Sequence, residues 1–451
     1  MRSRVLIPAA LVAVSALVPS LAASAGTGPD LATGSAYLAA PGNLIHGHYY
    51  ESFPGFADFG LTISAALALA ATGGQNPVLK GIVTFLGDGG KDPHGVTVNA
   101  WTGIGTHDVT GGSIADEALL AEVVGDSPRG FGGHDLITGL DAAVCAHASP
   151  GHGTRCPAAG SYVNSFSVFD QALGILAQLR AGQPRQAAAP IRYLESLQHA
   201  NGSFPSLIPP TGDQDVDSTA MAAMALALAP GKQAAADMAA GLAWIASRQE
   251  GNGGFPGAAG ESVNSAGLAV QGLTLRAARY RSQIGAALGF LAREQNSNGG
   301  FNVTAAGPRG SNVRASAQAL GGAVGTSLGT LHRNLSGTHT PPPTPTPAPT
   351  AHHTHPGTPA PAQVIASPAA PSTSPATSAP APMAGAGTPP GAATSPAAHR
   401  AFADASSDSA VAADLWWAVL AVAVTGGVVI CLLLLRRRRL SPAHPVAGGR
   451  R

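Results

Sequence analysis

Two aspartates stand at the start of an alanine-rich segment, in the stretch GDQDVDSTAMAAMALAL at residues 212–228. Asp215 and Asp217 are two residues apart, and Ser218 follows them directly. A carboxylic acid that stays protonated can donate a proton, and a neighbouring carboxylate can accept one, so the pair suits general acid–base catalysis. The same residue types also begin helices, because an Asp side chain accepts hydrogen bonds from free backbone N–H groups. Both interpretations depend on the elements that carry the pair.

Three segments of the chain align without gaps and predict those elements. They read YLESLQHANGSF at 193–204, WIASRQEGNGGF at 244–255 and FLAREQNSNGGF at 290–301, and their glutamines are separated by 51 and 46 residues. A period near fifty residues, built from helical pieces, indicates a repeat architecture. The residues that we expect to shape each repeat are Gln198, Gly202, Phe204, Gln249, Gly253, Phe255, Gln295, Gly299 and Phe301.

Each repeat predicts a helical hairpin. The first helix ends near the glutamine, where a glycine takes the left-handed conformation that stops it. A second helix, rich in alanine, begins about ten residues later. Six such inner helices are expected to begin near residues 61, 115, 169, 217, 264 and 314. Because six hairpins that close on themselves leave no unprotected ends, we predict an all-α fold, an α/α toroid of about six helical hairpins.

One aligned position varies in a way that bears on function. Asp217, Asn264 and Arg314 are equivalent in successive repeats. We interpret the position as a helix start with Asp217 as the cap, and there the helix dipole would lower the pKa of a carboxyl group. If the ring closes, all acids near the inner-helix starts gather at one mouth. The candidate ligand-binding residues are Asp58, Asp116, Asp170, Asp215, Asp217, Asn264 and Arg314.

The repeats resemble the QW repeat of terpene cyclases and protein prenyltransferases, which form α/α toroids, with Phe where the motif name has Trp. The likeness is specific in three units and looser in the first half. The chain is also similar to the toroid of cobalamin carriers and, in its organisation, to exported bacterial proteins with prenyltransferase and squalene oxidase repeats. In class II cyclases the third position of a D-x-D-D motif donates a proton. That position corresponds to Asp217, but Ser218 replaces the last acid.

The remaining pattern favours binding over catalysis. Cyclases of this family stabilise carbocations on aromatic faces, whereas the predicted domain contains two tryptophans, Trp101 and Trp244. We therefore expect a toroid that is not catalytic and binds a small molecule, such as a cobalamin-like nutrient, or an envelope partner. The alternative is a class II cyclase-like or glycan-acting enzyme that uses acids at the ring mouth, with Asp217 and Asp215 as its catalytic residues.

The cysteines and the net charge indicate which cofactors and partners are not expected. Cys145 and Cys156 most simply form a disulfide in an oxidising compartment, and no D-x-C pattern of a prenyltransferase zinc site occurs. We interpret His46 and His48 as part of a surface loop, and we expect neither a metal nor a cofactor. The net charge of +1 lacks the basic excess that a nucleic-acid partner requires.

The two ends of the chain predict its location. Residues 1–25 have the basic start, apolar run and small-residue cleavage pattern of a secretory signal peptide. Residues 337–414 are rich in Pro, Thr, Ser and Ala and predict a disordered stalk. Residues 415–435 are an uncharged apolar run that predicts a transmembrane helix, and the basic residues of 436–451 predict a cytoplasmic tail. We therefore expect residues 26–336 to be the extracellular domain of a single-pass type I membrane protein.

Overall fold

The computed structural model describes residues 28–149, 155–210, 212–257 and 260–335. The expected signal peptide, stalk, transmembrane helix and tail lie outside these residues. Among the residues described, none of the helices combines the length and the apolar character needed to span a bilayer.

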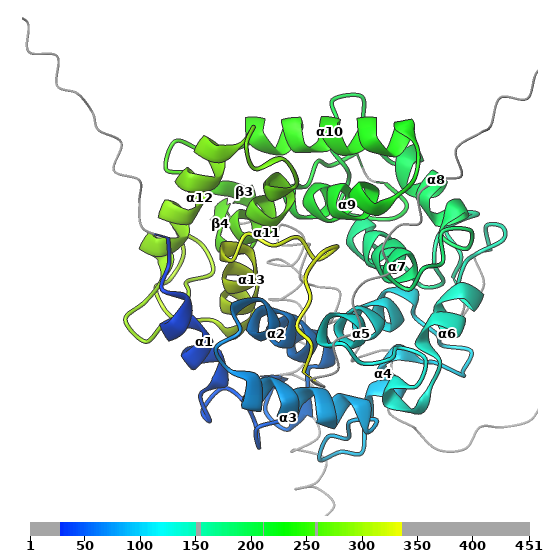
Figure 1. Cartoon of the computed structure of the whole chain (residues 1–451), viewed down its shortest axis with the longest axis horizontal. Helices are drawn as coiled ribbons and strands as arrows, with labels where there is room; N and C mark the ends of the chain where they lie inside the picture. Colours follow the sequence, from blue (N-terminus) through cyan, green and yellow to red (C-terminus); the bar gives the residue numbers. More distant parts are fainter. Residues whose placement is uncertain (1–27, 150–154, 211, 258–259, 336–451) are drawn as a thin grey trace, which may run out of the picture. The chain divides into compact units, whose positions relative to one another are not determined.

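The described residues form two concentric layers of helices (Figure 1). Each inner helix packs against the next one along the chain, and the last packs against the first, so the ring is closed. The inner helices are α2 (Phe59–Thr72), α5 (Gly111–Val124), α7 (Val168–Arg180), α9 (Val216–Leu228), α11 (Val263–Leu273) and α13 (Val313–Ala323). The outer helices are α1 (Leu31–Ala39), α3 (Asn76–Gly87), α4 (Val98–Thr102), α6 (Leu136–Ala142), α8 (Ala188–Ser196), α10 (Lys232–Ser247) and α12 (Arg281–Glu294). The prediction of an all-α toroid with six inner helices is confirmed.

Small residues allow the inner helices to lie close together. A Cβ atom added to Gly322 on α13 would lie 2.2 Å from the backbone oxygen of Gly267 on α11, so the two backbones touch there. Ala220, Ala222 and Ala223 on α9 are completely buried between their neighbours. A ring built from larger side chains would be wider, so the alanine and glycine content of these segments sets the diameter of the centre.

The three repeated glutamines join the outer helices α8, α10 and α12 to the outer helix that follows each of them around the ring. The side-chain amide of Gln198 donates to the backbone oxygens of Gly202 at 2.9 Å and Asp237 at 2.8 Å. Gln249 donates in the same way to Gly253 at 3.1 Å and Gln283 at 2.8 Å. Each glutamine thus holds its own turn and the start of the following outer helix.

The third glutamine closes the outer layer. Gln295 donates to the backbone oxygens of Gly299 at 3.0 Å and Asp30 at 2.8 Å, and its own oxygen accepts from the Asp30 N–H at 2.7 Å. Asp30 caps α1, so the end of α12 is tied to the first helix of the domain. The aromatic residues that end the three repeats, Phe204, Phe255 and Phe301, are completely buried.

Short hairpins and turns lie in the segments between the helices. Two antiparallel hairpins are present, β1 (Glu51–Phe53) with β2 (Phe56–Ala57) and β3 (Phe255–Gly257) with β4 (Gly260–Ser262). Two 3₁₀ turns, η1 (Phe131–Gly133) and η2 (Thr274–Arg276), complete the elements. Cys145 and Cys156 are joined by a disulfide, with an S–S distance of 2.02 Å.

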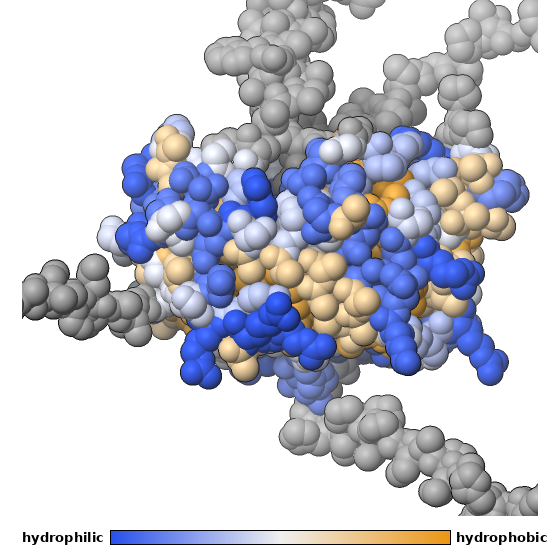
Figure 2. Space-filling model, turned by 90° about the horizontal axis from the view of Figure 1, so that it is seen from above, coloured by the Kyte–Doolittle hydropathy of each residue, from blue (hydrophilic) through white to orange (hydrophobic). Residues whose placement is uncertain are grey.

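The last described segment, residues 324–335, crosses the C-terminal ends of the inner helices (Figure 1, yellow). Its backbone N–H groups at Arg333 and Leu335 donate to the oxygens of Val123 and Val124 at the end of α5. The side chain of Arg180 on α7 donates to the backbone oxygens of Leu328 and Gly329, both at 3.0 Å. This segment therefore covers one face of the ring. The face of the domain that Figure 2 shows is a mixture of hydrophilic areas and apolar areas.

Candidate functional site

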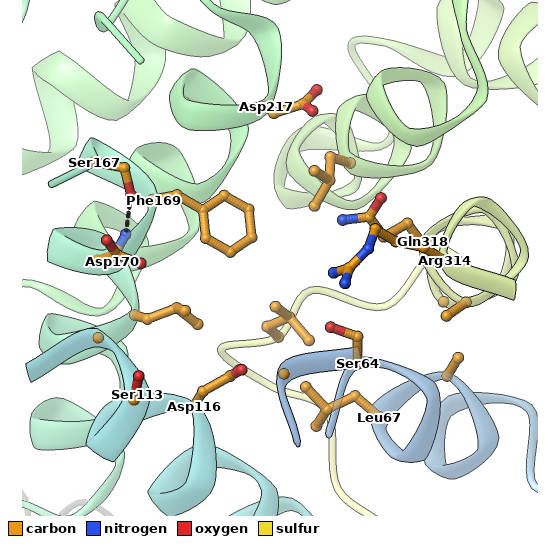
Figure 3. A pocket seen from close by; sticks show the side chains of 18 of the residues that line it. Ser64, Leu67, Ser113, Asp116, Ser167, Phe169, Asp170, Asp217, Arg314 and Gln318 are labelled. Atoms are coloured by element: carbon orange, nitrogen blue, oxygen red, sulfur yellow. Dashed lines mark hydrogen bonds between the residues drawn. The ribbon is translucent and has the colours of Figure 1, made fainter. Parts of the chain in front are cut away.

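A cavity of about 130 Å³ lies on the axis of the ring, bordered by inner helices (Figure 3). Its lining follows a simple rule of helix position. The second residues of the six inner helices are Gly60, Gly112, Phe169, Asp217, Asn264 and Arg314. The sixth residues are Ser64, Asp116, Leu173, Met221, Leu268 and Gln318. We call these sets the upper tier and the lower tier.

Nearly all of both tiers face the cavity. Every upper-tier residue except Asn264 and every lower-tier residue except Met221 lines it. Residues four apart lie on the same face of a helix, so the two tiers are successive turns of one inward-facing surface. Leu328 of the C-terminal segment and Trp101 of α4 also contribute to the wall. The cavity therefore has polar and apolar side chains in both tiers.

The predicted cap role of Asp217 is wrong. The cap of α9 is Asp215, whose side chain accepts from the Ser218 N–H at 2.7 Å. Ser262 and Asn312 cap the two following inner helices in the same way. The aligned position that is Asp217, Asn264 or Arg314 is therefore the second residue of each helix, two residues after the cap. Because the capping residue already satisfies the backbone, the side chain at this position is free to face the ring centre.

Asp116 lies deeper than the sequence predicted. Helix α5 begins at Gly111 instead of near residue 115, so Asp116 belongs to its second turn. The early start depends on the absence of side chains. A Cβ atom at Gly111 would lie 2.4 Å from that of Tyr162, and one at Gly112 would lie 2.7 Å from the Cβ of Asp170. The two glycines allow α7 and its preceding loop to approach α5, which brings Asp170 toward Asp116.

Asp58 and Arg314 form an ion pair across the point where α13 meets α2. The guanidinium of Arg314 donates to the Asp58 carboxylate at 2.6 Å. The other carboxylate oxygen of Asp58 accepts from the Leu61 N–H at 2.8 Å, which caps α2, and the Ser52 hydroxyl also bonds to the carboxylate. Asp58 therefore does not line the cavity itself, but it binds Arg314, which does.

Burial raises the pKa values of the carboxyl groups that face the cavity. The pKa of Asp116 rises to about 7, chiefly because burial disfavours its charge and further because Asp170 is near, while Arg314 acts in the opposite direction. The pKa of Asp217 rises to about 8, through burial first and the charge of Asp215 second. Burial also raises the pKa values of Asp170 and Asp215. The expectation that the helix dipole would lower the pKa of Asp217 is therefore wrong, because loss of solvent dominates.

Several polar atoms at the ring centre have no hydrogen-bond partner within the described part of the chain. They are all acceptors in their ionised or amide form, namely Asp170 Oδ2, Asp217 Oδ1, Asn264 Oδ1 and Gln318 Oε1. Buried polar atoms in native proteins are nearly always paired with protein groups, water or a ligand. Figure 3 shows Asp116, Asp170 and Asp217 on three different helices around the space, with Arg314 and Gln318 opposite Asp170.

The structure brings together most of the predicted ligand-binding residues, but not all. Asp116, Asp170, Asp217 and Arg314 line the cavity, whereas Asp215 caps α9 outside its wall. Sequence reasoning missed Ser64, Phe169 and Gln318. Phe169 is the second residue of α7, and Ser64 and Gln318 lie four residues after the second residues of α2 and α13, so these positions can be recognised only once each helix start is known.

No metal centre is evident in residues 28–335 as far as they are described, since no group of three or more His, Cys, Asp or Glu side chains is close enough to hold an ion. His46 and His48 belong to a loop beside α3, where the His48 ring stacks on Phe85 at 5.6 Å between centroids.

Comparisons with known proteins find likenesses in structure. No protein-family model matches this sequence, and no curated protein does. The type II terpene cyclase MstE from Scytonema is 13% identical, with a TM-score of 0.47 over 65% of this chain and 96% of that one. A polysaccharide lyase is 11% identical, with a TM-score of 0.46 over 65% and 96%. The unsaturated glucuronyl hydrolase from Bacillus sp. GL1 is 12% identical, with a TM-score of 0.43 over 64% and 93%. At these identities the likeness concerns the toroid alone.

Proposed function

We propose that the toroid is a binding domain whose central cavity holds a small, partly apolar organic molecule. The observation that carries this proposal is the set of buried, unpartnered acceptors around a cavity at the ring centre. A concave site with apolar walls and a few converging polar groups is the usual form of a small-molecule site. A bound molecule would supply the missing hydrogen bonds, and Leu67, Leu173 and Leu268 would contact its apolar part.

The size of the cavity limits the ligand. Its volume of about 130 Å³ is similar to that of an engineered cavity of roughly 150 Å³ that binds benzene. The enclosed part of a ligand would therefore have on the order of six to ten non-hydrogen atoms. A corrinoid is far larger, so the cobalamin-like nutrient that the sequence suggested gains no support. A folded terpenoid chain would also exceed this space unless the ring opened.

A cavity-filling variant tests the proposal. Gly60 faces the cavity, and a Cβ atom there would meet only ordinary contacts, at 3.6 Å from Trp101 and 3.8 Å from Asp58. We expect Gly60→Leu to leave the fold intact and to fill the space. The matched control is Gly285→Leu on outer helix α12, where nothing lies within 4 Å of an added Cβ.

The measurement is thermal stabilisation of the full-length chain by a panel of small amines, polyols, amino acids and short isoprenoid alcohols. At least one class should raise the melting temperature of the wild type and of Gly285→Leu but not of Gly60→Leu. Equal stabilisation of all three proteins would place binding elsewhere, and no stabilisation by any class would overturn the proposal.

General acid–base catalysis on the bound molecule is the second candidate. It is favoured by the carboxyl group of Asp217, which faces the cavity with a pKa raised to about 8 and so keeps a proton near neutral pH. Incubation with squalene, a C20 isoprenoid diphosphate or unsaturated uronic oligosaccharides tests it. Product formed by the wild type and lost in Asp217→Asn would favour an enzyme over a binding domain.

We also propose that the chain displays this domain on the outer face of a cell membrane. The support is the order of segments in the sequence, with a signal-like start, a proline-rich stretch and a final apolar run followed by arginines. Protease treatment of intact cells should release the toroid while the basic tail stays cell-associated. A toroid that is protected in intact cells would contradict this arrangement.

A further inference from the structure

We propose that the ligand of the central cavity is a small organic cation, a primary ammonium or amidinium group carried on a short apolar body. This inference rests on the proposed binding function and names the chemical class of the ligand. It follows from three features of the cavity, which are the kind of unpartnered atoms, the balance of charge and the nature of the walls.

The unpartnered atoms call for a hydrogen-bond donor. Among the residues that line the cavity, Asp170 Oδ2, Asp217 Oδ1 and Gln318 Oε1 are unpartnered oxygen atoms, and Gln318 offers its oxygen as an amide acceptor. An ammonium group has three donors and no acceptor, and an amidinium group is likewise a donor alone. Once the carboxyl groups are ionised they only accept hydrogen bonds, and a carboxylate or phosphate ligand would then bring further acceptors to a site that already has an excess of them.

The charge balance of the cavity calls for a positive group. Among the described residues that line it, Arg314 is the one permanent cation, and its guanidinium is already paired with Asp58 at 2.6 Å. Four ion pairs occur among the described residues, and none of them includes Asp116, Asp170 or Asp217. Helix α11 brings no titratable side chain to this space. Three carboxyl groups therefore surround the cavity with no positive charge of their own.

The walls suit the rest of such a molecule. The ring of Phe169 projects toward the centre of the cavity in Figure 3, and Trp101 lies in the lining. Aromatic faces attract organic cations through their quadrupoles, and Leu67, Leu173 and Leu268 offer apolar contact to a hydrocarbon body. Gly60 faces the cavity without a side chain, and an added Cβ atom there would meet only ordinary contacts, so the upper tier has room for the ligand on this side.

Binding of a cation should release protons. In the free protein near neutral pH Asp217 is mostly protonated and Asp116 is partly protonated, because burial raises their pKa values to about 8 and about 7. The groups that act on them are Asp170, Asp58 and Arg314 for Asp116, and Asp215 and the hydrogen-bonded Ser265 side chain for Asp217. A bound cation favours the ionised carboxylates. Affinity for an amine should therefore rise as the pH rises through 7 and 8, while an alkylammonium itself stays charged, as lysine does with a pKa near 10.4.

The test is isothermal titration of the full-length chain with three probes of one shape, cyclohexylamine, cyclohexanol and cyclohexanecarboxylate, at about pH 6 and pH 8.5. We expect cyclohexylamine to bind at least tenfold more tightly than either other probe at pH 8.5, and roughly tenfold more tightly there than at pH 6. Titrations in buffers of different ionisation enthalpy should show proton release. Asp217→Asn and Asp116→Asn should each weaken amine binding about tenfold and reduce that release, whereas Gly285→Leu should bind as the wild type does.

The outcomes separate this inference from the function on which it rests. If cyclohexanol or the carboxylate binds as tightly as the amine, or if the amine gives no heat, the ligand is not a cation and this inference is overturned. The binding function itself still stands in that case if Gly60→Leu abolishes the binding of another class. If Gly60→Leu leaves every binding event unchanged, both the site and its proposed function are wrong.

Discussion

The glutamine turns of the outer layer and the upper tier of the inner layer repeat with the same period but differ in how they vary. Gln198, Gln249 and Gln295 each make the same two hydrogen bonds to backbone oxygens. The upper tier, by contrast, reads Gly, Gly, Phe, Asp, Asn and Arg around one ring. A position that does the same mechanical work in each repeat keeps its residue type, whereas a position that faces a shared space does not need to. This difference in variation distinguishes residues that stabilise the toroid from residues that line its central cavity.

The largest effect that we predict is on the outer turns. Gly299 has a φ of +89°, and a Cβ atom there would lie 2.1 Å from the backbone oxygen of Thr33 on α1. Gly299→Val would force α12 and α1 apart at the closure of the ring and should lower the free energy of unfolding by more than about 3 kcal/mol.

Chemical denaturation of Gly299→Val measures this loss, with Gly285→Ala on the outer surface of α12 as the control. The control should be neutral or slightly stabilising, because Ala favours a helix over Gly by about 1 kcal/mol. If both variants unfold at the same denaturant concentration, the turns do not hold the ring.

Loss of the ion pair between α13 and α2 should have the next largest effect. Arg314→Gln leaves Asp58, which is nearly buried, without its charge partner. We expect a loss of about 2 kcal/mol, less than for a fully buried pair because the Arg314 side chain is 23% exposed. The double variant Asp58→Asn with Arg314→Gln should recover part of that loss, and a double variant no more stable than Arg314→Gln would argue against the pair.

A smaller loss should follow from removing one glutamine side chain. Gln295→Ala deletes the two bonds donated to Asp30 and Gly299 and the one accepted from Asp30. Because these bonds are partly open to solvent, we expect a cost of about 1–2 kcal/mol. Hydrogen exchange should show faster exchange in α1, and unchanged exchange there would mean that Gln295 does not anchor this helix.

The effect of the upper tier on stability should depend on pH. The pKa of Asp217 rises from 3.8 to about 8 in the folded state. Below about pH 4 both states hold the proton, so its contribution to stability is fully present. As the pH rises toward 8 the unfolded state loses the proton first, and the domain loses stability.

Asp217→Asn removes this titration. The variant should therefore lose less stability than the wild type between about pH 4 and pH 8, and the difference between the two proteins should grow across that range. Melting temperatures across that range measure the difference. Parallel curves for the two proteins would show that Asp217 is ionised throughout.

The sequence predicts the framework well because its signals are local. Gln and Gly at fixed spacing mark helix ends, and alanine-rich segments mark the inner helices, so the toroid follows from patterns that neighbouring residues create. Cys145 and Cys156 were paired on the same kind of local argument, and they are bonded in the structure.

The site was harder to predict because it depends on where each helix begins. The pair Asp215 and Asp217 shows this, since both residue types can cap a helix and tertiary structure alone decides that Asp215 does. Asp116 is a second residue whose place in the site depends on where its helix begins. Two glycines are poor helix formers by propensity, yet Gly111 and Gly112 begin α5 because Tyr162 and Asp170 occupy the space their side chains would need. The raised pKa values depend on burial by five other helices, which no single segment encodes.

The protonation of the cavity carboxyl groups is the most direct test of this account. Carbon-13 NMR of aspartate-labelled full-length chain, with Asp116→Asn and Asp217→Asn for assignment, follows each carboxyl group through a pH titration. The account predicts that Asp116 and Asp217 titrate near 7 and near 8 in the free protein, and that saturating cyclohexylamine shifts both below their free values. Titration of both groups near 4, as for exposed aspartates, with no response to the amine, would contradict it.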